Sequence, residues 1–176
     1  MADYEAILRE MLADGSARFA AYGYLLTGSQ DAGEELVQEA IVKVFARRRA
    51  IPNARAAEAY VRATMRTLHV DGIRRAARWR KVMPGQVPPE AVDDAADAID
   101  TADAMGHALA TLTPQQRTAI VLRYYDDLAL ADVADAMGLA VGTVKRYLSD
   151  ALDRLAAAVG DQDLEFERIA VIERGM

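Results

Sequence analysis

Residues 128–155 read LALADVADAMGLAVGTVKRYLSDALDRL, and the spacing of their apolar residues decides the expected fold. A short helix over about 130–137 would bury Val133, Ala134 and Met137. Gly138 would supply a tight turn, and a second helix would begin near Val141. The apolar face of that second helix comprises Val144, Leu148, Ala151, Leu152 and Leu155. This pattern predicts a helix-turn-helix, although a plain helical hairpin has similar spacing and remains an alternative.

The outer face of the second helix carries groups that suit DNA. Hydroxyl and basic side chains can contact base edges and phosphates. The candidate DNA-contacting residues are Thr143, Lys145, Arg146, Tyr147 and Ser149. Asp150 and Asp153 share this face, where phosphate repels a carboxylate, but an Asp can also accept a hydrogen bond from a cytosine amino group. We therefore expect weak binding or an unusual sequence preference here.

The rest of the chain also predicts helices. Upstream, Thr113 and Pro114 suit the N-cap and the first position of a helix, and apolar residues recur at Leu109, Leu112, Ile120, Val121 and Tyr124. In the N-terminal half, two more stretches show helical spacing: Leu36, Val37, Ala40, Ile41, Val44 and Phe45, then Tyr60, Val61, Met65 and Leu68. Strand signals are poor. The sequence predicts an all-α protein.

Between the two helical parts lies a stretch rich in Pro, Asp and Ala. Pro84, Gly85, Pro88 and Pro89 break helices, and the acidic residues that follow have no basic neighbours up to residue 105. We expect an N-terminal helical domain over 1–82, a flexible acidic linker over 83–104, a helical domain over 105–159 and a C-terminal tail over 160–176. The tail is apolar enough to pack against some surface.

Composition excludes several classes of protein. The 176 residues include no cysteine and only two histidines, so disulfides, thiol catalysis and a metal site are not expected. No nucleophile–base constellation or phosphate-binding loop marks an enzyme, and no cofactor is expected. The N-terminus has acidic residues where a signal peptide would be basic and then apolar, and no stretch is apolar enough to span a membrane. We therefore expect a cytoplasmic protein.

The net charge of −6 is unevenly distributed. Between Lys43 and Lys81 lie twelve of the 21 basic residues but only two of the 27 acidic ones, Glu58 and Asp71. The overall acidity argues against nucleic acid as a partner, whereas this basic stretch argues for one.

Residues 128–155 resemble region 4, the promoter −35-binding part, of bacterial extracytoplasmic-function (ECF) sigma factors, which belong to the sigma-70 family. The resemblance rests on Asp132–Ala134, Met137-Gly138 and Gly142–Ser149 (GTVKRYLS). Residues 112–117 (LTPQQR) and 121–125 (VLRYY) match the same family. The resemblance implies that the candidate residues of the second helix bind −35 DNA. Asp150 and Asp153 depart from the family, which usually has basic residues there.

A second motif, residues 33–40 (GEELVQEA), resembles region 2 of the same family, which binds the β′ clamp of RNA polymerase. Glu35, Gln38 and Glu39, beside Val42, lie opposite the apolar stripe of the expected helix. A solvated charged face is the common interpretation of such residues. A short acidic face with an exposed β-branched residue also suits docking on a basic helix. The resemblance implies that these four residues bind core RNA polymerase.

Within the basic stretch, residues 59–62 (AYVR) and 66–81 (RTLHVDGIRRAARWRK) resemble the −10 recognition part of region 2. Its arginines could neutralise phosphates near unwound DNA, and Asn53, in a loop, could read an unstacked base. Trp79, expected to be exposed, is a candidate stacking ring; Tyr60 is one too, although core packing explains it equally well. The resemblance implies a −10 set of Asn53, Arg55, Tyr60, Arg62, Arg66, Arg74, Arg75, Arg78 and Trp79.

The resemblance thus implies a sigma factor that binds core RNA polymerase, directs promoter-specific initiation and, as is common in the family, is held by an anti-sigma factor. No small-molecule substrate and no membrane insertion are expected. A stand-alone helix-turn-helix regulator is the alternative, but it leaves the GEELVQEA face unexplained. Such a regulator would bind duplex DNA alone, usually as a dimer.

Overall fold

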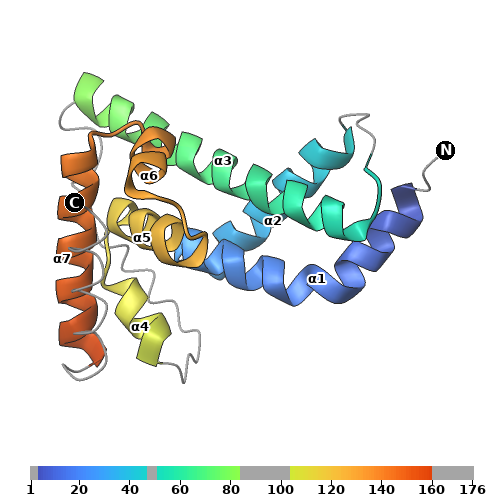
Figure 1. Ribbon diagram of the computed structural model, residues 1–176, viewed down its shortest axis with the longest axis horizontal. Coiled ribbons are helices and arrows are strands. Elements are labelled where there is room, and N and C mark those ends of the chain that lie inside the picture. The colour runs from blue at the N-terminus through green and yellow to red at the C-terminus, as the bar shows by residue number, and fades with distance from the viewer. Residues whose placement is uncertain (1–3, 47–50, 84–103, 160–176) are drawn as a thin grey trace. The chain divides into compact units, whose positions relative to one another are not determined.

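The computed structural model describes residues 4–46, 51–83 and 104–159, and every regular element in these ranges is a helix (Figure 1). The elements are α1 (Tyr4–Thr27), α2 (Gln30–Ala46), α3 (Ala54–Val82), α4 (Ala104–Ala110), α5 (Pro114–Ile120), the π-helix η1 (Val121–Tyr125), α6 (Leu130–Met137) and α7 (Val141–Val159). The all-α prediction is confirmed. Most of the expected linker and the tail lie outside the described residues.

The chain forms two compact units, residues 1–72 and 73–176, which divide within α3. The domain boundaries expected from the sequence remain predictions. In the first unit, α1 and α2 pack along each other, and α3 completes the core. The largest buried side chains of this core are Met11, Phe19, Tyr22 and Leu26 from α1, Ile51 from the segment before α3, and Val61 and Met65 from α3.

Two glycines allow the backbones of α1 and α2 to touch. A Cβ atom built on Gly23 would lie 2.7 Å from the Gly33 carbonyl oxygen, and one on Gly33 would lie 2.8 Å from the Gly23 carbonyl carbon. No side chain fits between them, because atoms at such distances overlap. The short turn between the helices has Gly28 at φ 75°, in the left-handed region. The Ser29 N–H donates to the Thr27 hydroxyl at 3.2 Å, which ties this turn to the end of α1.

An ion pair fixes α3 against α1. The Arg18 guanidinium donates to both carboxylate oxygens of Glu58, from Nε at 3.1 Å and from Nη2 at 2.8 Å. Such paired hydrogen bonds fix orientation as well as distance. The register of α3 on α1 therefore has a polar determinant at the surface in addition to its apolar core.

In the second unit, α5 begins with the N-cap expected at Thr113. The Thr113 hydroxyl accepts from the Gln116 N–H at 3.3 Å, and the Gln116 side chain accepts from the Thr113 N–H at 3.1 Å. Pro114 follows at the first helical position. This capping box satisfies two N–H groups that the helix itself leaves without partners. The continuation of α5 as the π-helix η1 was not predicted from the sequence.

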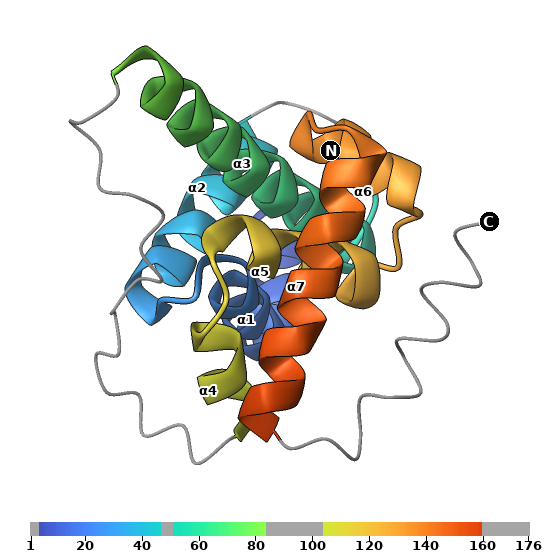
Figure 2. The same ribbon diagram turned by 90° about the vertical axis from the view of Figure 1, so that its left-hand side faces the viewer.

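The predicted helix-turn-helix is confirmed as α6, a turn and α7, and Figure 2 shows α7 lengthwise beside α4, α5 and α6. Gly138 closes α6 at φ 65°, the left-handed conformation that glycine adopts at low cost. The expected apolar residues of both helices are buried: Val133, Ala134, Met137, Val144, Leu148, Ala151, Leu152 and Leu155.

Candidate functional site

The outer face of α2 carries the four candidate polymerase-binding residues. Glu35, Gln38 and Glu39 are exposed, and Val42 is 65% exposed. Leu36, Ala40 and Val44 are buried on the opposite side, where they hold α2 to the core. The Glu39 carboxylate forms an ion pair with Lys43 at 2.8 Å. An exposed apolar side chain among acidic and amide groups is the arrangement expected of a docking surface.

The candidate −10 residues do not form one cluster on α3. Arg55, Arg62 and Arg66 are spaced seven and four residues apart, so they share one side of the helix. Tyr60, Arg74 and Arg78 follow the same periodicity on another side. Arg75 is exposed between these positions, and Trp79 is 55% exposed, as expected.

Two members of this set have structural roles within the first unit. The Arg62 guanidinium carbon lies 5.2 Å from the centre of the Tyr22 ring of α1, within the range of a cation–π interaction. Asn53 is exposed, and its Oδ1 accepts from the Ala56 N–H at 2.9 Å, which caps the start of α3. The amide NH₂ group of Asn53 and the second lone pair of its Oδ1 remain for a base.

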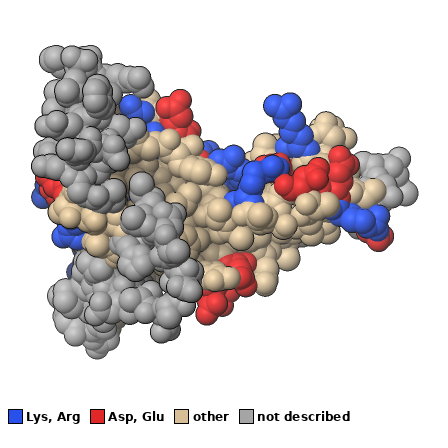
Figure 3. Space-filling view, turned by 90° about the horizontal axis from the view of Figure 1, so that it is seen from below, with Lys and Arg blue, Asp and Glu red and all other residues tan. Residues whose placement is uncertain are grey.

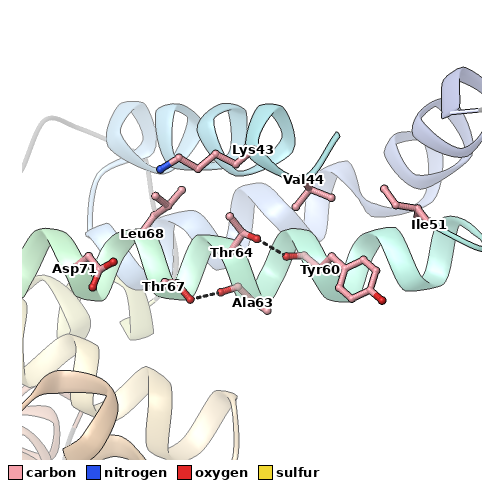
Figure 4. A pocket seen from close by; sticks show the side chains of 9 residues that line it. All are labelled: Lys43, Val44, Ile51, Tyr60, Ala63, Thr64, Thr67, Leu68 and Asp71. Atoms are coloured by element: carbon pink, nitrogen blue, oxygen red, sulfur yellow. Dashed lines mark hydrogen bonds between the residues drawn. The ribbon is translucent and has the colours of Figure 1, made fainter. Parts of the chain in front are cut away.

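Tyr60 forms part of a pocket of about 300 Å³ between α2 and α3 (Figure 4). The pocket is lined by Lys43, Val44, Ile51, Tyr60, Ala63, Thr64, Thr67, Leu68 and Asp71. The Thr64 and Thr67 hydroxyls donate to the carbonyls of Tyr60 and Ala63, at 2.8 and 2.9 Å, so their remaining capacity is to accept. Tyr60 is 39% exposed and is thus neither core nor fully free. The pocket combines an aromatic ring, apolar walls and groups of both charges.

The outer face of α7 is open to solvent. Lys145, Arg146 and Ser149 are exposed, whereas Thr143 and Tyr147 are half-buried at its edge. The Arg146 guanidinium carbon lies 5.7 Å from the centre of the Tyr147 ring. Asp150 and Asp153 are exposed on this face too, as the sequence indicated. In a helix-turn-helix, this face and the N-terminal turns of the second helix approach the bases.

Arg117 has a role that sequence analysis missed. It is 3% exposed and its guanidinium donates to main-chain carbonyls: Nη2 to Leu109 at 3.1 Å and to Leu112 at 3.3 Å, and Nε to Leu109 at 3.3 Å. It thereby fastens the end of α4 and the following turn to α5. The polar pocket residues Lys43 of α2 and Thr64, Thr67 and Asp71 of α3 were missed too, because nothing in the local pattern of either helix distinguishes them from solvated polar residues.

Charge on the visible surface is mixed. Figure 3 shows a face on which Lys and Arg side chains lie beside Asp and Glu side chains. Within the described ranges, no three His, Cys, Asp or Glu residues are grouped so as to hold a metal ion. None of the helices described has the length and apolarity needed to cross a membrane.

Comparison with known proteins shows that the chain is similar to sigma factors. Residues 102–155 match the family described as "Sigma-70, region 4". The chain is 31% identical over 141 residues to the RNA polymerase sigma-E factor of Streptomyces avermitilis, covering 80% of this chain and 78% of that protein. It is 32% identical over 159 residues to the ECF RNA polymerase sigma factor SigL of Mycobacterium tuberculosis, covering 85% and 87%.

A solved structure has a similar fold. The sigma factor RpoE from Bartonella quintana, in complex with the anti-sigma factor NepR, matches with a TM-score of 0.54 and 23% identity. The match covers 92% of this chain and 99% of that one.

Proposed function

Because the chain belongs to the ECF sigma factors of the sigma-70 family, which bind RNA polymerase and DNA and direct transcription initiation, we propose that α2, α3 and α7 divide these tasks. In this proposal α2 docks on core polymerase, α3 contacts the −10 element and α7 reads the −35 element. The observation that carries it is the open outer face of α7 in a helix-turn-helix whose inner face is fully buried. Sigma factors perform no covalent chemistry, and this chain is not an enzyme.

Reconstitution with core RNA polymerase tests the proposal. We expect promoter-specific transcripts only when core enzyme and this chain are both present. Tight, specific binding of duplex DNA by the chain alone, with nothing added by polymerase, would instead favour a stand-alone helix-turn-helix regulator.

The polymerase contact is proposed to be the α2 face of Glu35, Gln38, Glu39 and Val42, and its proposed partner is the β′ clamp. An acidic face suits a basic partner helix, and Val42 offers apolar area that is now exposed to water. All four side chains project from one rigid helix, so the docking surface is preformed and costs little ordering on binding.

Replacing Gln38 and Glu39 together by alanine should weaken binding to core polymerase about tenfold or more, because both lie within the proposed contact. Folding should be retained, since both side chains are exposed. Affinity can be measured with labelled protein and core enzyme. The matched control is Glu10→Ala, which removes an exposed acid from α1. Equal affinities for the double variant and the wild type would rule out this face.

At the −10 element, the proposed contact is the side of α3 with Tyr60, Arg74 and Arg78, and Trp79 as a further stacking ring. Single-stranded DNA is bound by stacking on aromatic rings and by cations along its backbone. The pocket beside Tyr60 offers a ring, a lysine and hydroxyl acceptors, which suit an unstacked base. Of the other predicted contacts, Arg55, Arg66 and Arg75 would serve as phosphate partners, while Arg62 and Asn53 also stabilise the fold.

A bacterial sigma factor acts together with RNA polymerase on chromosomal DNA, so we propose that the protein works in the cytoplasm. We also propose that an anti-sigma factor regulates it. A protein of similar fold is bound by such a factor, and the α2 face that would engage polymerase is open to any competitor.

A further inference from the structure

One residue on the reading face of α7 has a charge that DNA binding does not favour. Asp150 is exposed and lies four residues after the exposed Arg146, so the two align on the outer side of the helix, with the half-buried Thr143 at its edge. The buried side carries Val144, Leu148 and Ala151. Asp150 is therefore directed by the helix toward whatever α7 contacts.

The neighbouring cation does not neutralise Asp150. Residues four apart on a helix can form an ion pair, as Glu39 and Lys43 do at 2.8 Å. No such pair joins Arg146 to Asp150 in the described part of the chain; instead Arg146 lies against the Tyr147 ring, with 5.7 Å between guanidinium carbon and ring centre. Both charged groups are thus available to a ligand.

Each of these two groups has a preferred base in the major groove, and for a carboxylate this is cytosine, because the amino group of adenine lies beside the N7 acceptor. Arginine donates two hydrogen bonds to O6 and N7 of guanine, whereas a carboxylate accepts from the N4 amino group of cytosine. Phosphate, the other abundant group, attracts Arg146 but repels Asp150. An aspartate that remains on a reading helix can therefore contribute to binding only through a base with an exposed amino group.

We propose that Asp150 is a specificity-determining residue that selects a cytosine in the −35 element, near a guanine read by Arg146. This inference rests on the proposed reading role of α7. Four residues span about 6 Å along a helix, and successive base pairs are about 3.4 Å apart, so the cytosine should lie within about two base pairs of that guanine. Asp153, one turn further from the N-terminal end that enters the groove, has no such role.

The test is selection from promoters with a randomised −35 element, by holoenzyme reconstituted from core polymerase and the full chain. Wild-type protein should enrich cytosine about fivefold or more at one position. Asp150→Ala should remove this preference. Asp150→Asn should shift it toward adenine, because an amide pairs with the N6 and N7 edge of adenine. Asp153→Asn makes the same change in charge and should leave the base preference unchanged. Arg146→Ala should abolish the preference for guanine at the neighbouring position.

Two results would overturn the inference. If both Asp150 variants bind every promoter more tightly with unchanged base preference, Asp150 acts by repelling phosphate and selects nothing. If the wild-type holoenzyme enriches no −35 sequence at all, the reading role of α7 itself is wrong. Circular dichroism confirms that each variant is folded, as expected for exposed positions.

Discussion

Replacing Gly33 by alanine should destabilise the first unit by about 3 kcal/mol, at the upper end of the usual cost of overpacking. The new Cβ would lie 2.8 Å from the Gly23 carbonyl carbon and 2.9 Å from the Tyr24 nitrogen. These are backbone atoms of α1, which cannot rotate aside as a side chain can. The helices must therefore separate, and the buried contacts on both sides of the crossing loosen. Urea unfolding and hydrogen exchange in α1 and α2 measure the effect.

Gly72→Ala is the matched control, because it makes the same substitution inside another helix, where the added Cβ would meet no atom within 4 Å beyond its chain neighbours and the adjacent backbone of its own helix. It should stabilise the protein by about 0.5–1 kcal/mol, since alanine has the better helix propensity. If both variants were stabilised alike, the backbones of α1 and α2 would not be in contact, and the described crossing would be wrong.

Replacing Arg117 by methionine should destabilise the second unit by about 2–4 kcal/mol. Methionine has a similar length but no donor, so the buried carbonyls of Leu109 and Leu112 would lose their charged partner. Lysine should give an intermediate loss, because a single ammonium group cannot reproduce the forked geometry of the guanidinium. Binding of −35 DNA by the holoenzyme should fall with stability, because α5 supports α7.

The control for this series is Arg154→Met. The Arg154 Nη1 donates to the Thr111 carbonyl at 3.0 Å, in the same connection between α4 and α5, but the side chain is exposed. Water can replace that hydrogen bond, so the loss should be below about 1 kcal/mol. Thermal unfolding ranks the variants, and equal losses for Arg117→Met and Arg154→Met would contradict the buried role of Arg117.

The arginines of the basic stretch have different roles in the structure, and the sequence pattern did not separate those roles. Residues 43–81 contain many arginines, but charge alone does not distinguish Arg62, which lies on the Tyr22 ring, from Arg78, which is exposed. Tyr60 was equally compatible with the core and with stacking, and the structure puts it at the rim of a pocket. The exposure of Val42 and Trp79, by contrast, followed from their positions on helices of known periodicity.

The sequence by itself determined the features that depend on neighbours within about one helical turn. The Thr113–Gln116 capping box, the left-handed Gly138 and the buried face of α7 are of this kind, because hydrogen bonds and periodicity act over three or four residues. The two family motifs also indicated the ECF sigma factors, the family to which the chain belongs. The π-helix η1 could not be predicted in this way, because a short apolar pattern hardly changes when one residue is added to a helical turn.

Only the tertiary structure decided which faces meet. The contact of Gly23 with Gly33 and the Arg18–Glu58 pair each require two helices to cross at one particular register. The Arg117 clamp requires α5 to pack beside the end of α4. Such contacts depend on the whole set of buried surfaces together, and no single stretch of sequence encodes where two helices touch.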